Sequence, residues 1–236
     1  SLKVGMRNMF RMPTFNDLYY TDMGNIHLEP ETTSQFNVGL SYDREWRRAV
    51  TVSLGIKVDA YHIDVDNKIV AIPKGNGQYR WQMMNIGRAL IRGIDVGVTT
   101  ALVLPGDVHL RMNVNYTYQR AQDMSEPSNP LTYGGQIAYV PRHSGSATLS
   151  AEWRLLTLNY SFIYVGERYH NSANIPANYE QPWYTHDMAL RKTFRLKRVA
   201  LSAAIEVNNL LNQQYDVILN YPMPGRNYRA SLKVEL

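Results

Sequence analysis

Hydrophobic and polar residues alternate with a period of two along most of this chain. The alternation is most regular in the segments 49–65, 107–119, 156–164, 199–207 and 228–236, where apolar or aromatic residues occupy every second position. Successive side chains of a β-strand point to opposite faces of a sheet. The pattern therefore predicts strands that each have one apolar face and one polar face.

The alternating segments are long compared with strands of soluble proteins, which have about 5–6 residues. Several reach the ~9–11 residues that a tilted strand needs to cross a bilayer. The apolar rows within 50–58 and 108–118 contain no charged residue. A lysine or arginine at the middle of a lipid-facing row would cost about 2–4 kcal/mol, so this absence favours contact with lipid.

We predict strands near 2–8, 33–44, 49–65, 84–102, 107–121, 143–153, 156–169, 183–194, 199–209 and 225–236. Long connections follow at 9–32, 66–83, 122–142, 170–182 and 210–224, and tight ones at 45–48, 103–106, 154–155 and 195–198. Outer-membrane barrels alternate in this way between short periplasmic turns and long extracellular loops, whereas a soluble β-sandwich does not require it. The predicted fold is all-β: an antiparallel, up-and-down transmembrane β-barrel segment of about ten strands.

Two of the predicted strands change phase along their length. In the segment 85–98, apolar residues move from one face to the other at Gly93, and a similar change follows Ala60. Because glycine inside a strand often marks an irregularity, we predict a β-bulge or kink at Gly93.

Composition narrows the choice of protein class. The chain has 236 residues with 17 Tyr, a residue that suits strands and membrane interfaces. It contains no Cys, so neither a disulfide nor a thiolate metal site is expected. The sequence contains no run of about 18 apolar residues, so it predicts no transmembrane helix. The net charge is +5, but basic residues concentrate in the short segments 43–48 and 191–198 without a nucleic-acid-binding motif, so no nucleic-acid partner is expected.

Several short motifs occur in a fixed order over nearly the whole chain. They are FRMPTFNDLYY (10–20), GNIHLEPETTSQFNVGLSY (24–42), NIGRALIRGIDVGV (85–98), YVPRHSGSATLSAEW (139–153), VNNLLNQQYD (207–216) and YPMPGRNYRASLKV (221–234). Together they resemble the C-terminal half of TonB-dependent outer-membrane receptors. Two positions depart from that family's pattern: Asp95 stands where Glu is more usual, and Leu211 replaces Phe. The segments 173–187 and 221–228 are similar to those of Bacteroidetes members.

The resemblance implies a barrel of about 22 strands with a plugged lumen. Residues 1–236 would then be the C-terminal part of the barrel, with the plug domain and the first strands absent from this chain. It also implies location in the bacterial outer membrane, contact with its lipid, and coupling to the TonB complex through the missing N-terminal plug region. The function implied is active uptake of a scarce nutrient: a ferric siderophore first, otherwise cobalamin, haem or an oligosaccharide.

We expect no catalytic residue, no metal site and no cofactor in this chain. His62 and Asp64 are two positions apart and share a face of a strand, which would suit an acid–base pair, but no nucleophile motif accompanies them. A hydrated barrel rim explains both residues more simply.

A ligand-binding role is expected instead for aromatic and basic residues of the long connections. In such receptors, as the resemblance implies, these side chains hold a small molecule or metal chelate at the extracellular mouth, where stacking and charge suit an aromatic anion. The candidates are Tyr19, Tyr20, Tyr79, Arg80, Trp81, Tyr133, Tyr169, His170 and Trp183. For Trp81 and Trp183, which flank strands, packing in an aromatic girdle is the simpler explanation.

Two alternative functions remain open on the sequence. A self-contained ten-stranded outer-membrane barrel could act as a protease or an adhesin, and a soluble β-rich module could bind a ligand in solution. The long segment 9–32 and the short first strand argue against the self-contained barrel.

Overall fold

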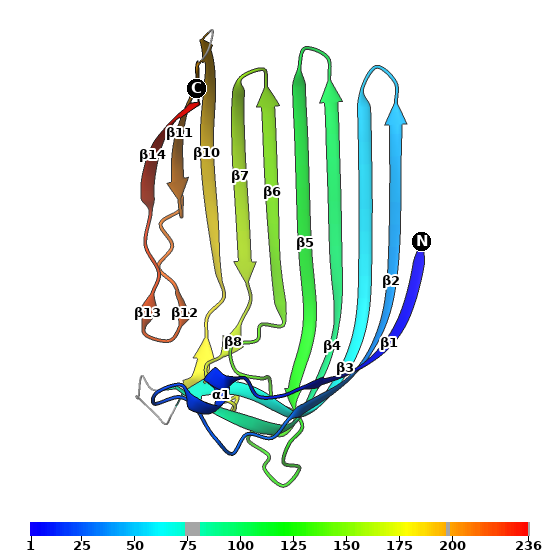
Figure 1. Ribbon diagram of the computed structural model, residues 1–236, viewed down its shortest axis with the longest axis vertical. Helices are drawn as coiled ribbons and strands as arrows, with labels where there is room; N and C mark the ends of the chain where they lie inside the picture. The colour runs from blue at the N-terminus through cyan, green and yellow to red at the C-terminus, as the bar shows by residue number, and fades with distance from the viewer. Residues whose placement is uncertain (74–80, 197–198, 236) are drawn as a thin grey trace.

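The computed structural model describes residues 1–73, 81–196 and 199–235 and consists almost entirely of antiparallel strands (Figure 1). Ten of them form one sheet in the order β1-β2-β3-β4-β5-β6-β7-β10-β11-β14. The strands are β1 (Leu2–Arg11), β2 (Glu31–Arg47), β3 (Thr51–Pro73), β4 (Trp81–Leu104), β5 (Val108–Asp123), β6 (His143–Trp153), β7 (Leu156–Val165), β10 (Trp183–Leu196), β11 (Val199–Asn208) and β14 (Asn227–Glu235). The predicted all-β, up-and-down antiparallel arrangement is confirmed.

The remaining elements lie in the long connections. They are a helix α1 (Phe15–Tyr19), a 3₁₀ turn η1 (Pro176–Asn178), and two small hairpins, β8 (Arg168–Tyr169) with β9 (Tyr179–Glu180) and β12 (Asp216–Ile218) with β13 (Tyr221–Pro222). Figure 1 shows the tight turns at the upper end of the sheet and these elements at the lower end, called the loop end below. Among the described residues, no helix is long and apolar enough to cross a membrane.

Several predicted strand boundaries are wrong. β1 ends at Arg11 rather than near residue 8, β2 ends at Arg47 rather than near residue 44, and two further differences are larger. The segment 66–83 was expected to be a loop, but β3 and β4 continue as a paired hairpin out to Pro73 and Trp81. The backbone N–H of Ile69 donates to the Glu31 carboxylate (3.1 Å), which holds this extension against β2. The strand predicted over 156–169 instead ends at Val165, and the N–H of Gly166 donates to the carbonyl of His143 (2.8 Å).

The β-bulge predicted at Gly93 is also wrong. β3 and β4 keep one register through the region, with Ala60 opposite Ile94 and Tyr61 opposite Gly93, and the pairing of β4 with β5 is likewise unshifted. A Cβ atom at Gly93 would collide with the ring of Tyr61 and would lie 2.7 Å from the carbonyl oxygen of Tyr118. The glycine therefore makes room for a tyrosine ring from the neighbouring strand.

A hydrophobic cluster at the loop end explains why the apolar phase changes. Its buried members come from three strands and one connection, and four partly buried residues pack against them. The buried ones are Val65, Ala89, Ala121 and Ile137, and their neighbours are Ile63, Ile86, Ile91 and Val140. The connection 124–142 supplies Ile137 and Val140, so the sheet face that is polar further along the strands becomes covered there and takes apolar side chains.

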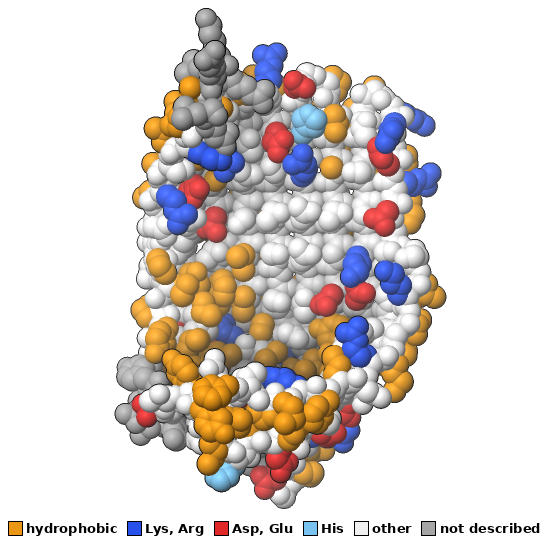
Figure 2. Space-filling model, in the orientation of Figure 1, with side chains coloured by type: hydrophobic (Ala, Val, Ile, Leu, Met, Phe, Trp, Pro, Cys, Tyr) orange, Lys and Arg blue, Asp and Glu red, His pale blue; other side chains and the backbone are white. Residues whose placement is uncertain are grey.

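The two faces of the sheet differ over the rest of its length. Residues paired across strands share a face, and on one face apolar residues lie side by side, for example Val58 with Leu40 and Val96. On the other face polar residues meet, and the Thr117 hydroxyl donates to the Asp95 carboxylate (2.7 Å). Figure 2 shows a face with polar and charged side chains over the strands and hydrophobic ones gathered toward the loop end.

The sheet has two open edges, β1 and β14. All side chains of β1 are exposed, and on β14 the apolar Tyr228, Leu232 and Val234 are more than half exposed. An unpaired strand edge presents free N–H and C=O groups that can pair with a further strand.

Candidate ligand-binding surface at the loop end

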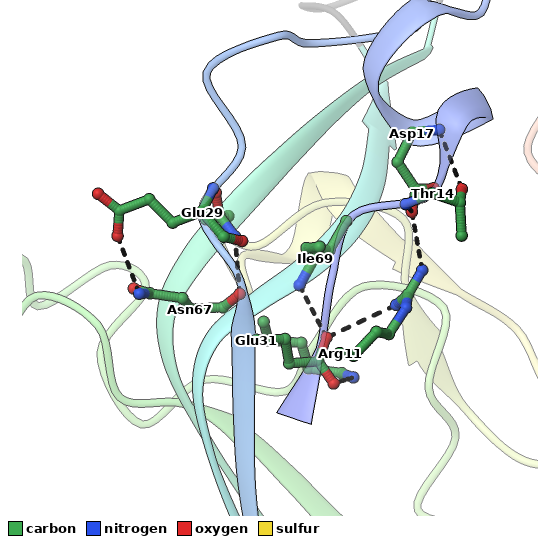
Figure 3. Close-up of polar contacts among 9 residues, drawn as sticks. Arg11, Thr14, Asp17, Glu29, Glu31, Asn67 and Ile69 are labelled. Atoms are coloured by element: carbon green, nitrogen blue, oxygen red, sulfur yellow. Dashed lines mark hydrogen bonds and ion pairs between the residues drawn. The ribbon is translucent and has the colours of Figure 1, made fainter. Parts of the chain in front are cut away.

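The connection 12–30 is fixed by a charged network around α1 (Figure 3). Thr14 and Asp17 form a capping box: the N–H of Asp17 donates to the Thr14 hydroxyl (3.2 Å), and the N–H of Thr14 donates to the Asp17 carboxylate (2.9 Å). Arg11, the last residue of β1, donates to the same carboxylate (3.0 Å). Burial raises the pKa of Asp17, but the contacts with Thr14 and Arg11 outweigh it, so the pKa lies below its ordinary value.

Glu31, the first residue of β2, is a second buried carboxylate in this network. Its carboxylate accepts the hydrogen bond from Ile69 and lies 3.6 Å from the Arg11 guanidinium and 3.7 Å from the Lys68 ammonium. Arg11 therefore bridges Asp17 and Glu31 and ties α1 to the β2–β3 pair. The first two family-like motifs supply these residues, and their role here is to position the connection.

Asparagines join the same connection to the extended hairpin. The side chain of Asn85 donates to the carbonyl oxygens of Glu29 (3.1 Å) and Asn67 (2.7 Å), and the Asn67 side chain donates to the Glu29 carboxylate (2.9 Å). Asn67 has a φ of 54°, in the left-handed region that asparagine tolerates. Residues near Glu29 are thus held along the start of β4.

Arg168 in β8 ties two other connections together. Its side chain is buried, with the residue 2% exposed, and it donates to the carbonyl oxygens of Gln181 (3.3 Å), Asp216 (2.7 Å) and Val217 (3.2 Å). Burial lowers the pKa of the guanidinium, with nearby acidic groups opposing the shift. Because these hydrogen bonds go to backbone atoms, Arg168 fixes the path of both connections.

A third set of bonds adds the connection 124–142 to this unit. The side chain of Gln136 donates to the carbonyl oxygens of Val140 (2.5 Å) and Glu167 (3.3 Å), and the Asn174 side chain donates to the Gln136 carbonyl (3.0 Å). The N–H of Tyr139 donates to the carbonyl of Tyr169 (2.8 Å). The connections 124–142, 166–182 and 209–226 therefore pack as one body at the loop end.

The last two family-like motifs also meet. Asn209 is buried, and its side chain donates to the carbonyl oxygens of Gln213 (2.8 Å) and Pro224 (3.3 Å). The side chain of Asn212 accepts from the N–H of Arg226 (2.9 Å). These asparagines close the connection 209–226 onto the start of β14.

The predicted ligand residues in the connections 12–30 and 124–142 are exposed. Tyr19 and Tyr20 are each 58% exposed beside α1, with the Tyr19 ring 4.9 Å from that of Phe15. Tyr133 is 40% exposed in the connection 124–142. These three tyrosines are accessible to a ligand, but none of them contacts another through a hydrogen bond, and Tyr133 stacks on neither of the other two rings.

The remaining predicted residues are more enclosed. Trp81 packs on Tyr139, with ring centroids 5.8 Å apart, and Trp183 stacks on Tyr215 at 4.6 Å. Each tryptophan is the first residue of its strand, as the packing interpretation expects. The predicted residues Tyr79 and Arg80 lie outside the described residues.

Tyr169 and His170 lie next to each other in a small charged and aromatic group. The Tyr169 ring meets that of Tyr179 edge-on at 6.0 Å, and His170 Nδ1 lies 2.9 Å from the Glu180 carboxylate. The Tyr139–Tyr169 backbone bond brings this group close to Trp81. Sequence reasoning thus missed Tyr139, Tyr179 and Glu180 as members of this group. Tyr139 opens the motif 139–153 but was not among the ligand candidates, and Tyr179 and Glu180 stand in none of the six motifs.

His62 and Asp64 do not act on each other as an acid–base pair. Arg92 donates to His62 Nδ1 (3.2 Å), and Arg88 donates to the Asp64 carboxylate (2.8 Å). Within the described ranges, no group of three or more His, Asp or Glu side chains is placed to hold a metal ion.

A cavity of about 250 Å³ lies between the extended β3–β4 hairpin and the connections 124–142 and 166–182. Its lining is mainly apolar, with charge supplied by Lys68 and Asp123. The apolar lining residues are Val70, Ala71, Ile72, Ile86, Ile137, Ala138 and Val140. The volume is just below the ~300–1,000 Å³ of typical small-molecule sites.

Comparison with known proteins identifies the family. Residues 2–210 match the model of the family described as TonB dependent receptor-like, beta-barrel, and the chain belongs to this family. It is 30% identical over 174 residues to the vitamin B12 transporter BtuB of Photobacterium profundum, an alignment that covers 70% of this chain and 24% of that protein.

Solved structures share the fold. The ferric-catecholate import receptor Fiu from K12 E. coli superposes with a TM-score of 0.68 at 15% identity, over 99% of this chain and 32% of that one. The ferripyoverdine receptor of the outer membrane of Pseudomonas aeruginosa gives a TM-score of 0.62 at 17% identity, over 98% and 30%. The chain spans about a quarter to a third of the length of these three proteins. The resemblance stated from the motifs is confirmed at family level, and a Bacteroidetes origin stays a prediction.

Proposed function

We propose that this chain is the C-terminal part of the barrel of an outer-membrane receptor that imports a scarce nutrient with energy delivered through TonB. The plug domain and the first strands would belong to the preceding part of the same protein. The observation that carries the proposal is the family match over residues 2–210, supported by a ten-stranded sheet with two open edges. The family consists of transporters and receptors, which does not favour a self-contained protease.

The proposed cargo is a ferric siderophore, with cobalamin, haem or an oligosaccharide as alternatives. Relatives whose names state a cargo include a vitamin B12 transporter and a ferric-catecholate import receptor. The loop end offers exposed aromatic rings for stacking, Tyr19, Tyr20 and Tyr133 above all. His170 beside Tyr169 adds a polar group, whereas Trp81 and Trp183 support the surface by packing.

Ligand binding to the purified full-length receptor tests this assignment. Members of each cargo class are titrated against the parent receptor and against the double variant Tyr19→Ala/Tyr20→Ala. We expect one class to bind and the double variant to bind it about tenfold or more weakly, since each ring supplies stacking area. Tyr42→Ala is the matched control, because this exposed tyrosine lies on β2 toward the end with tight turns. Failure of every class to bind, or an equal loss in the control, would contradict the assignment.

A further inference from the structure

A row of basic side chains crosses three adjacent strands near the loop end. His62 of β3 pairs with Arg92 of β4, and Arg92 pairs with Arg120 of β5. All three residues are exposed. Because neither Gly93 nor Ala60 marks a bulge, these residues stay on the face that carries the apolar rows, rather than on the polar face. We call this set the basic row.

The basic row lies where the apolar rows end. The next pair on the same face, two residues along each strand, is Ile94 with Tyr118, and both side chains are about two-fifths exposed. On β5 the apolar row runs from Val108 to Tyr118. That span is about 33 Å along the strand, or ~25 Å across the membrane at a tilt of about 40°, which matches the height of a barrel's apolar band. The basic row is therefore at the headgroup level of the leaflet next to the loop end.

The charges of the basic row are not balanced by the protein. Arg92 and Arg120 are directly opposite each other, an arrangement that is destabilising for like charges. The contact that Arg92 makes is with a ring nitrogen of His62, which accepts the hydrogen bond but supplies no negative charge. The neighbouring carboxylate, Asp64, is already paired with Arg88. In the described part of the chain, no hydrogen bond or ion pair holds the Arg120 side chain.

We propose that the basic row binds the phosphate group of a glycolipid headgroup in the outer leaflet. Arg92 and Arg120 present two guanidinium groups to one phosphate, a geometry that allows bidentate hydrogen bonds and removes the like-charge repulsion. The acyl chains of the same lipid lie along the apolar rows that begin at Ile94 and Tyr118. The inference rests on the proposed outer-membrane location, and it adds a lipid site that is separate from the nutrient site.

The test measures lipid binding to the full-length receptor purified in neutral detergent. The probes are lipid A with both phosphates and the same lipid after dephosphorylation, and bound lipid is counted by native mass spectrometry and titrated for affinity. We expect Arg92→Gln/Arg120→Gln to weaken binding of the phosphorylated lipid about tenfold or more, with no change for the dephosphorylated lipid. Arg111→Gln is the matched control, because Arg111 is on β5 but faces the opposite side, where it pairs with Glu152.

A second readout separates lipid recognition from a structural role. Without lipid, the double variant should unfold at the same temperature as the parent or a higher one, because the like-charge pair is gone. With phosphorylated lipid, the parent should become the more stable protein, because only the parent binds that lipid tightly. Equal affinity of parent and double variant for phosphorylated lipid A, or equal binding of the dephosphorylated lipid by the parent, would overturn the proposal. Nutrient uptake should be the same in the double variant and in the parent, because the lipid site is separate from the nutrient site. A parent receptor that binds phosphorylated lipid A but imports no nutrient would refute the proposed function and leave the lipid site standing.

Discussion

Gly93 and Gly97 lie four positions apart on β4, on the same face, yet their surroundings differ. A Cβ atom at Gly93 would overlap the Tyr61 ring and approach the Tyr118 carbonyl, whereas at Gly97 the nearest atom is the Asn115 side-chain oxygen at 3.5 Å. We therefore predict that Gly93→Ala destabilises the full-length barrel by about 1–3 kcal/mol through overpacking, while Gly97→Ala is tolerated. Urea unfolding in detergent measures both.

A rescue variant identifies the cause. Adding Tyr61→Ser to Gly93→Ala removes the ring but not the Tyr118 carbonyl, so stability should return in part. Equal stability of Gly93→Ala and Gly97→Ala would show that the sheet accommodates the methyl group and that the tyrosine ring does not require the glycine.

Arg168 gives a second prediction at the residue scale. Arg168→Met would leave the carbonyl oxygens of Gln181, Asp216 and Val217 without their donor, at a cost of about 2–3 kcal/mol. We expect protease cleavage within 209–226 to become at least tenfold faster in the full-length receptor. The control Arg226→Met should cleave at the parent rate, because the bond that Arg226 makes uses its backbone N–H.

Some of these residues could be predicted from sequence and others could not. Arg11, Asp17 and Asn209 stand in motifs, so attention falls on them before their contacts are known. Arg168 and Gln136 are buried polar residues in connections, and no periodicity or spacing marks a side chain whose partners are backbone carbonyls of distant segments. Residue type alone points to the exposed Tyr19, Tyr20 and Tyr133, and their role in binding stays a prediction.

At the scale of elements, α1 depends on the charge of Asp17. The pKa of this carboxyl is lowered in the folded protein, so its charged form stabilises the capping box above the ordinary pKa of about 3.9. This stabilisation is lost as the pH falls through the lower folded-state pKa. We expect the Leu18 amide, which donates to the Thr14 carbonyl (3.1 Å), to lose hydrogen-exchange protection below about pH 4.

Asp17→Asn supplies the comparison for this prediction. The amide cannot carry the charge that Arg11 and the Thr14 N–H stabilise, so protection at Leu18 should be low at neutral pH and should change little on acidification. Protection in the parent that stays constant from pH 7 to pH 3, after correction for intrinsic exchange, would show that the capping box does not depend on the carboxylate.

The strands themselves were predictable because their period of two reflects a sheet with one apolar face and one polar face. The predicted strand boundaries and the predicted bulge are wrong where the surroundings of a sheet face change along the strands. Beyond Ala60, Ile137 and Val140 cover the face of the sheet that is polar elsewhere, so apolar residues occupy that face. The resulting change of phase in the sequence resembles the one that a bulge would produce. The extension of β3 to Pro73 depends on pairing with β4 and on the Glu31–Ile69 bond, which are long-range contacts that a local pattern does not contain.

For the whole molecule, the open sheet and the family match lead to one account. The edges β1 and β14 would each pair with a strand from the preceding part of the receptor, and closure would place the apolar face against lipid and the polar face toward the plug. The loop end would then form part of the extracellular mouth, with Arg11 and Arg168 holding its connections in place.

Energised uptake by the full-length receptor tests this account most directly. A strain lacking the receptor is complemented with the full gene, and import of the radiolabelled ligand identified by titration is followed in the presence and in the absence of TonB. The account predicts rapid import with TonB and surface binding without import when TonB is absent. Import that continues at the same rate without TonB, or a receptor that neither binds nor imports any of the four cargo classes, would contradict it.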